Sequence, residues 1–160
     1  FANFIMPIAP FVQVAFSQIN ADTMTPTNAA LQANIKTAVV GTYPNFMLDY
    51  AKIQISRGSL QPGGTVKAEV ASGILMISWT DKAIGIQKGH LDDAVHILLY
   101  HPELDEFLTA PEPPTRGMGT VDIELPEHFL GSKGQLWLFF ADRKNKRISR
   151  THYLGEFDLV

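Results

Sequence analysis

The sequence predicts a mainly β protein: a β-sandwich of the fibronectin type III or immunoglobulin kind, with seven or eight strands, preceded by a helical N-terminal arm. Three observations predict this fold. From residue 50 onward, apolar residues alternate in short runs with the period of two that is typical of strands. Turns containing Gly and Pro separate these runs, with no crossover helices between them. The first 44 residues instead place apolar side chains three or four positions apart, the spacing of a helix face.

Length and composition limit the possibilities further. The chain has 160 residues, of which 46% are hydrophobic and 18% charged, as in a folded domain. We expect a helical arm over residues 1–44 and a sandwich domain over residues 45–160. The formal net charge of −3 is too near balance to predict a nucleic-acid partner. The absence of cysteine excludes disulfides and thiolate metal sites.

The helical arm is predicted in two parts. Twelve of the first sixteen residues are Ala, Val, Ile, Met or Phe. Two prolines should divide this segment into two short helical pieces, or into an extended start followed by a helix. The same prolines interrupt the richest apolar run, so we expect no membrane span. A second helix is predicted from Thr25, an N-cap followed by Pro26, to Gly41, a residue suited to a left-handed helix end. Tyr43-Pro44 then ends the helical region.

The strands are predicted from the alternating runs. The run 135–141 has the most apolar sequence, and Trp79 at the end of another run fits the core of a fibronectin type III domain. Gly155 is expected to form a bulge or kink, and residues 111–119 a connection without strands. The expected strands lie within residues 52–56, 65–70, 74–80, 93–101, 106–110, 120–125, 135–141 and 148–160.

Four segments carry a resemblance to a known family: residues 28–60, ILMISWTD (74–81), DAVHILLYHPE (93–103) and THYLGEFDLV (151–160). Together they resemble the C-terminal part of DUF6266, a bacterial domain of unknown function, over nearly the whole chain. Members of that family usually carry a further Gly-rich segment ahead of the position where this chain begins. The resemblance supports one folded unit and implies no activity, cofactor or catalytic residue.

No residue constellation predicts catalysis. His96 and His101 lie five apart on one predicted strand, so they point to opposite faces and cannot share a metal ion. His90, Asp92 and Asp93 form a candidate metal or acid–base cluster, but a plain connection between strands is the favoured interpretation. The acidic groups at 103–106 and 122–124 are interpreted as solvated surface rather than a glycosidase pair. We therefore predict no catalytic residue, no metal ligand and no cofactor, and we expect that the protein is not an enzyme.

A basic segment follows the run 135–141. Arg143, Lys144, Lys146 and Arg147 are the residues that we predict to contact an acidic partner or a glycan, if the segment binds anything. A hairpin end kept soluble by its charge is the favoured interpretation. No aromatic residues alternate with these charges, which argues against single-stranded nucleic acid.

The apolar arm provides the leading functional hypothesis, a non-enzymatic structural or assembly protein. Apolar side chains left in water forfeit about 1.5–3 kcal/mol each, so the arm needs a surface to cover it. That surface is either its own sheet or a neighbouring subunit, which would give a homo-oligomer or an open head-to-tail filament. An extracellular or cell-surface assembly is expected. The residues predicted for self-association are Phe1, Phe4, Ile5, Ile8, Phe11, Val12 and Phe16.

The second hypothesis is a binding module for a glycan or a protein. Loops on a rigid sandwich commonly carry recognition, and the candidates are residues 81–92 and 111–119. These loops contain few aromatic residues, which counts against stacking on sugars.

Overall fold

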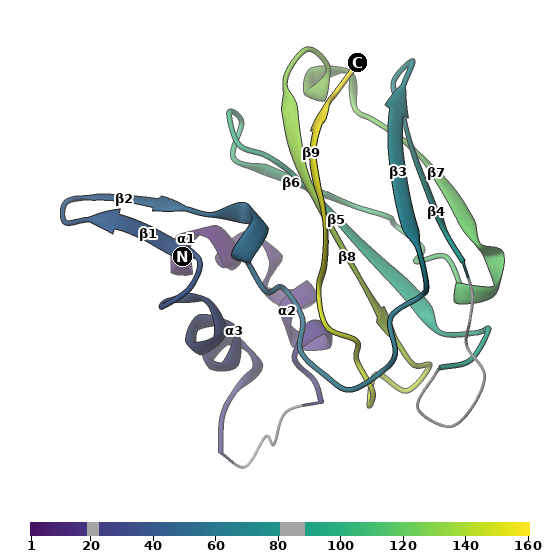
Figure 1. Cartoon of the computed structure of the whole chain (residues 1–160), viewed down its shortest axis with the longest axis horizontal. Coiled ribbons are helices and arrows are strands. Elements are labelled where there is room, and N and C mark those ends of the chain that lie inside the picture. The colour runs from purple at the N-terminus through teal and green to yellow at the C-terminus, as the bar shows by residue number, and fades with distance from the viewer. Residues whose placement is uncertain (19–22, 81–88) are drawn as a thin grey trace.

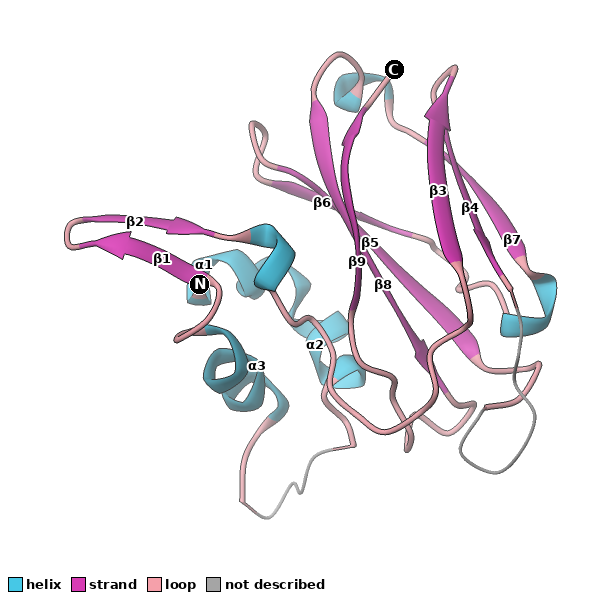
Figure 2. Ribbon diagram, viewed as in Figure 1, coloured by secondary structure: helices cyan, strands magenta, loops and turns pink. Residues whose placement is uncertain are grey.

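The computed structural model describes residues 1–18, 23–80 and 89–160 (Figure 1). Strands make up most of the regular structure, and helices occur near the N-terminus and as short single turns (Figure 2). The prediction of a mainly β fold with a helical N-terminal segment is therefore confirmed.

Two antiparallel sheets form the body of the molecule. The smaller sheet has the order β3-β4-β7, with strands β3 (Val66–Ala71), β4 (Ile74–Trp79) and β7 (Thr120–Glu124). The larger sheet has the order β6-β5-β8-β9, with strands β5 (Ala94–His101), β6 (Glu106–Thr109), β8 (Lys133–Ala141) and β9 (His152–Asp158). A shared apolar core joins the inner faces of the two sheets and includes Leu75, Ile77, Ile97, Leu138 and Phe140.

Residues 1–16, called the arm from here on, form three short helical segments, where the prolines predicted two helical pieces or an extended start followed by a helix: α1 (Ala2–Ile5), a 3₁₀-helix (Met6–Ile8) and α2 (Ala9–Ala15). Each proline occupies the first turn of its helix, where a missing N–H removes no intrahelical hydrogen bond. The arm packs on the outer face of the larger sheet, against alternate residues of β5 and β8. Because β5 and β8 are covered on both faces, their sequences are continuous apolar runs.

The next helix is shorter than the sequence predicts. Helix α3 (Pro26–Asn34) begins as expected, and the hydroxyl oxygen of its N-cap Thr25 accepts a hydrogen bond from the Asn28 N–H at 3.2 Å. The predicted continuation to Gly41 is wrong. Asn34 is the last residue of the helix, and its buried side chain holds this end in place: its amide donates to the Gln54 carbonyl at 2.8 Å and its oxygen accepts the Gln54 N–H at 2.6 Å. One further turn follows, in which the Ala38 N–H donates to the Asn34 carbonyl at 2.9 Å before the strand begins.

A β-hairpin takes the place of that continuation. Its strands are β1 (Val39–Thr42) and β2 (Asn45–Leu48), and the predicted boundary between residues 44 and 45 falls in the turn between them. The β-branched residues of β1 favour an extended strand over a helix. Gly41 has φ = +101°, and a Cβ there would collide with the backbone oxygen of Asn45. Gly41 is therefore required by the hairpin rather than by a helix end.

Most other predicted strands are present. The exception is the segment around Ile53 and Ile55, which is extended and buries both side chains but pairs with no strand in the described structure. Its backbone is held by a side chain instead: the Thr151 hydroxyl oxygen accepts the N–H groups of Ile55 and Ser56, each at 2.9 Å. The bulge predicted at Gly155 is confirmed by a shift in register between β8 and β9 opposite that residue.

Candidate interaction surfaces

The arm residues predicted for self-association lie mostly inside their own chain. Phe1 and Phe11 are half-buried, and the buried ones are Phe4, Ile5, Ile8, Val12 and Phe16. Phe4 makes edge contacts with Tyr100 and Phe107, with ring centroids 4.9 and 5.1 Å apart. The outer face of the larger sheet thus provides the apolar cover that the arm needs. No helix among the described residues has the length and apolar character required to cross a bilayer.

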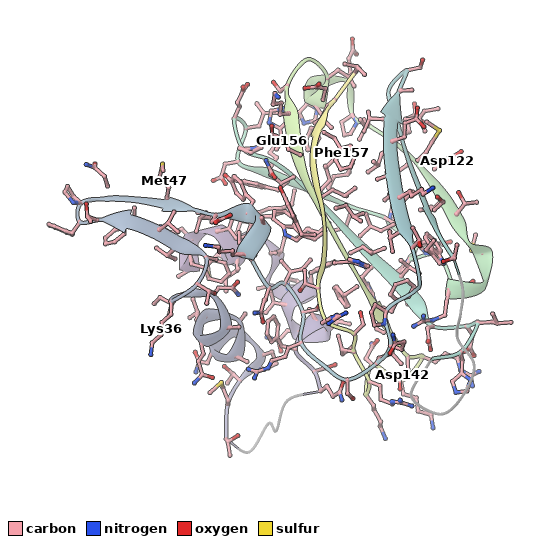
Figure 3. All side chains as sticks on the ribbon, in the orientation of Figure 1. Lys36, Met47, Asp122, Asp142, Glu156 and Phe157 are labelled. Atoms are coloured by element: carbon pink, nitrogen blue, oxygen red, sulfur yellow. The ribbon has the colours of Figure 1, made fainter. Side chains whose placement is uncertain are left out.

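The β1–β2 hairpin projects from the body of the molecule and carries large apolar side chains that are exposed to solvent. It extends away from both sheets (Figure 1), and Met47 points outward from it (Figure 3). Tyr43 is 87% exposed, Phe46 56% and Met47 68%. The rings of Tyr43 and Phe46 contact each other, with centroids 6.5 Å apart. Neither ring contacts another aromatic ring among the described residues. The hairpin therefore presents an apolar surface that the described residues of its own chain do not cover.

The base of the hairpin is anchored through the arm. Ala29 and Ala30 of α3 are buried in the same core cluster as the arm residues. The Asp49 N–H donates to the Ala38 carbonyl at 2.7 Å and closes the base of the hairpin. The Trp137 indole N–H donates to the Tyr50 carbonyl at 3.3 Å, which ties the chain beyond β2 to the larger sheet. The arm, through α3, and the larger sheet therefore hold the hairpin in position together.

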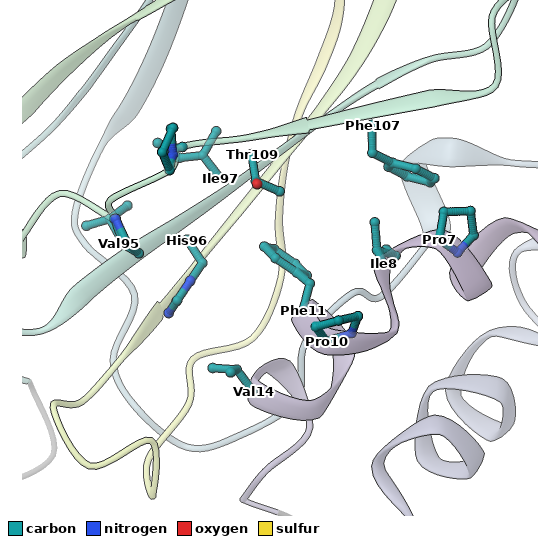
Figure 4. A pocket seen from close by; sticks show the side chains of 13 residues that line it. Pro7, Ile8, Pro10, Phe11, Val14, Val95, His96, Ile97, Phe107 and Thr109 are labelled. Atoms are coloured by element: carbon teal, nitrogen blue, oxygen red, sulfur yellow. The ribbon is translucent and has the colours of Figure 1, made fainter.

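An apolar groove of about 420 Å³ runs between α2 and strands β5 and β6 (Figure 4). Pro10, Phe11 and Val14 line one wall, and His96 faces them from β5. His96 stacks on Phe139 with centroids 4.8 Å apart, and burial lowers its pKa from 6.5 to about 4. The imidazole is therefore neutral near pH 7, and the groove lining carries no charge.

Of the two loops predicted for binding, 81–92 and 111–119, the structure describes the second in full and only residues 89–92 of the first. Residues 81–88 lie outside the described residues. Pro111 and Pro113 from the other loop line the end of the apolar groove. Farther along the same loop, Arg116 turns inward and its side chain is 1% exposed, whereas Met118 stays 61% exposed.

Arg116 contacts four other parts of the chain. Its Nε lies 3.0 Å from Oδ2 of Asp93, and both side chains are buried. Its guanidinium also donates to the Gln61 carbonyl at 2.8 Å and lies 4.2 Å from the centre of the Phe140 ring. The Trp79 indole N–H donates to the Arg116 carbonyl at 2.7 Å. This ion pair fixes one end of the sheets, and no sequence pattern pointed to it.

The candidate cluster of His90, Asp92 and Asp93 does not converge. Oδ2 of Asp93 accepts the His90 backbone N–H at 2.8 Å and pairs with Arg116, while Asp92 pairs with Arg143 at 2.7 Å. No group of three His, Asp or Glu residues in the described part of the chain is arranged to hold a metal ion.

The other sequence predictions concern His96, His101 and the basic segment. His96 contacts the arm side of the larger sheet and His101 contacts Phe129 in the inner core, so they face opposite sides as predicted. The structure brings the basic segment together at the turn after β8: Arg143, Lys144 and Lys146 are exposed there, and Arg147 is half-buried.

These surfaces and sheets define a mainly β protein whose described residues expose an apolar hairpin and an apolar groove. The model of a family of unknown function, DUF6266, matches residues 1–155, and the chain belongs to that family. The match includes the arm and the hairpin, so it is not confined to a C-terminal part. A comparison with curated proteins found no match.

Proposed function

We propose that this protein is a non-enzymatic assembly module that self-associates through the β1–β2 hairpin. The observation that carries the proposal is the exposure of Tyr43, Phe46 and Met47 on an element that projects from the body. Each large apolar side chain withdrawn from water on association contributes about 1.5–3 kcal/mol. Exposed apolar surface gathered on one element is typical of protein–protein contact sites.

The charge pattern supports the same surface. Residues 37–48 contain no Asp, Glu, Lys or Arg, although 18% of the chain is charged. Protein interfaces are depleted in charged residues at their centres and enriched in Tyr, Phe and Met. The hairpin has this composition.

The arm has a supporting role in this proposal. Most of its residues predicted for self-association are buried against β5 and β8 and cannot form the contact surface in this conformation. They instead provide the platform on which α3 and the hairpin rest. The proposal therefore keeps self-association and moves it from the arm to the hairpin.

The proposed scaffold is a sandwich of the fibronectin type III kind. Its support is the strand order, three strands (β3-β4-β7) facing four (β6-β5-β8-β9), together with Trp79 buried at the end of β4. Such sandwiches commonly serve in cell-surface proteins, which agrees with an extracellular or cell-surface assembly. This likeness concerns the scaffold and says nothing about activity.

The experiment is a measurement of molar mass by light scattering after size-exclusion chromatography, over a range of protein concentrations. We expect the mass to rise above that of one chain as the concentration rises. A variant with Tyr43, Phe46 and Met47 replaced by Thr should stay monomeric. The matched control replaces three exposed apolar residues elsewhere, Leu91, Leu104 and Met118, by Thr and should associate like the unmodified chain. A monomer at every concentration would overturn the proposal.

The groove favours a second candidate function, binding of an apolar peptide. Its uncharged lining of Pro, Phe and Val residues is chemically suited to such a ligand, and its volume falls within the range of ligand sites, roughly 300–1,000 Å³. Thr109, an exposed groove residue, offers the test. Thr109→Glu should prevent binding of an anilinonaphthalene sulfonate dye, because it places a carboxylate beside the anionic probe, without changing the molar mass. Equal dye fluorescence in both proteins would count against this function.

A further inference from the structure

We infer that strand β2 pairs edge to edge with β2 of a second copy of this chain, about a two-fold axis, to form a four-stranded sheet β1-β2-β2-β1. The inference rests on the proposed self-association and names its partner and its symmetry.

The free edge of β2 is the first observation. Within the described structure β1 and β2 pair only with each other, so the outer edge of each strand lacks a partner strand. In β2 three of the four residues are exposed, whereas the first half of β1 is half-buried. The edge of β2 is therefore the more accessible one. An unpaired edge is a template for another strand unless charge, proline or a bulge protects it.

The absence of charge is the second observation. In a two-fold contact the same patch meets itself, so any charged residue near the axis would face a like charge. Protective Lys or Glu residues are common on free edges, yet β2 has none, and Pro44 lies in the turn rather than on the strand. The nearest following charge, Asp49, pairs with Lys52 at 3.4 Å at the base of the hairpin. The patch is thus electrostatically compatible with its own copy.

The available area predicts a weak, reversible dimer. An aromatic side chain offers roughly 150–250 Å². With the exposed fractions of Tyr43, Phe46 and Met47, the hairpin offers roughly 400 Å² of apolar surface per copy. A standard stable interface buries about 800 Å² per partner. Backbone hydrogen bonds along the new edge add to this contact, and we expect a dissociation constant in the micromolar range.

A charge-complementation experiment tests the pairing. One variant carries Phe46→Lys with Met47→Lys, and the other carries Phe46→Glu with Met47→Glu. Changing two consecutive residues places like charges close together whichever register the two β2 strands adopt. The measurement is sedimentation velocity of each variant alone, of their equimolar mixture and of the unmodified chain, and circular dichroism checks that both variants are folded.

The expected result is a dimer for the unmodified chain, monomers for each variant alone, and a dimer again for the mixture. If each variant alone still forms dimers, the pairing and the hairpin's role in the proposed function are both overturned, and the chain associates through another surface. If neither the variants nor their mixture form dimers, the hairpin meets a different surface, such as the groove of the next copy, and the two-fold pairing is overturned. If the unmodified chain is monomeric at every concentration, both the pairing and the proposed function fail.

Discussion

Replacing Phe16 by Ala tests whether the arm belongs to the folded core. Phe16 is 0% exposed and lies with the arm in the cluster on the outer face of the larger sheet. Removing such a ring costs about 3–5 kcal/mol, because the transfer energy is lost and a cavity is left. Domains of this kind are stable by about 5–15 kcal/mol, so the loss is a large fraction of the total.

Urea unfolding followed by circular dichroism measures this effect. With a denaturant dependence of about 2 kcal/mol per M, the midpoint should fall by about 1.5–2.5 M. The matched control is Met6→Ala in the same arm, because Met6 is 68% exposed and its truncation should cost less than about 0.5 kcal/mol. Unchanged midpoints for both variants would refute the reasoning, because the arm would then contribute nothing to the core.

Three further predictions concern stability. Arg116→Met should lower the free energy of unfolding by about 3–5 kcal/mol, because it leaves Asp93 buried without its cation. Adding Asp93→Leu should restore much of that loss in the same urea assay. A double variant no more stable than the single one would contradict this. Burial holds the pKa of His96 at about 4 in the folded state, against 6.5 when exposed, so protons bind the unfolded chain preferentially. The free energy of unfolding should therefore fall by about 2 kcal/mol between about pH 7 and 5, and His96→Leu should flatten that dependence; an equal slope in both proteins would argue against a buried neutral imidazole. Gly89→Ala should lower the free energy of unfolding by about 3 kcal/mol and Gly73→Ala by about 1 kcal/mol. Both glycines have positive φ, but only a Cβ at Gly89 meets the Asp93–Arg116 pair. Equal thermal midpoints for the two variants would disprove this difference.

The sheets were largely predictable because their pattern is local. Alternation in β3 and β7 and the long apolar runs of β5 and β8 reflect how many faces of each strand are covered, and burial imposes that pattern directly on the sequence. The division of the arm was predictable for another local reason, because a proline limits the helix in which it stands.

The hairpin was not predicted because the helical spacing of apolar residues continues into its first strand. Residues 31, 35, 38 and 39 have this spacing, and the hydrogen bonds from the Asn34 side chain to the Gln54 backbone, 20 positions away, leave no local pattern in the sequence. Tyr43-Pro44-Asn45 between β-branched and aromatic residues was the signal that a turn between strands lay there. Exposure of Phe46 and Met47 is a property of the folded chain, so the candidate contact surface was not visible in the sequence.

The Arg116–Asp93 pair was missed for a similar reason. The two residues are 23 positions apart: Arg116 lies in a predicted connection, and Asp93 is the first residue of a predicted strand. Asp93 beside His90 had the residue types of a metal or acid–base site, yet the fold assigns its carboxylate to a buried cation. Residue types close together in sequence therefore do not reveal the partner of this side chain.

Amide hydrogen exchange of the hairpin, measured on dilute and on concentrated protein, tests the central claim most directly. Pairing of β2 with its copy predicts that amides of Asn45–Leu48 exchange more slowly as the protein associates, while amides of the solvent-exposed turn after β8 do not change. If the protein associates and exchange in β2 stays as fast as in the monomer, the hairpin is not the contact surface.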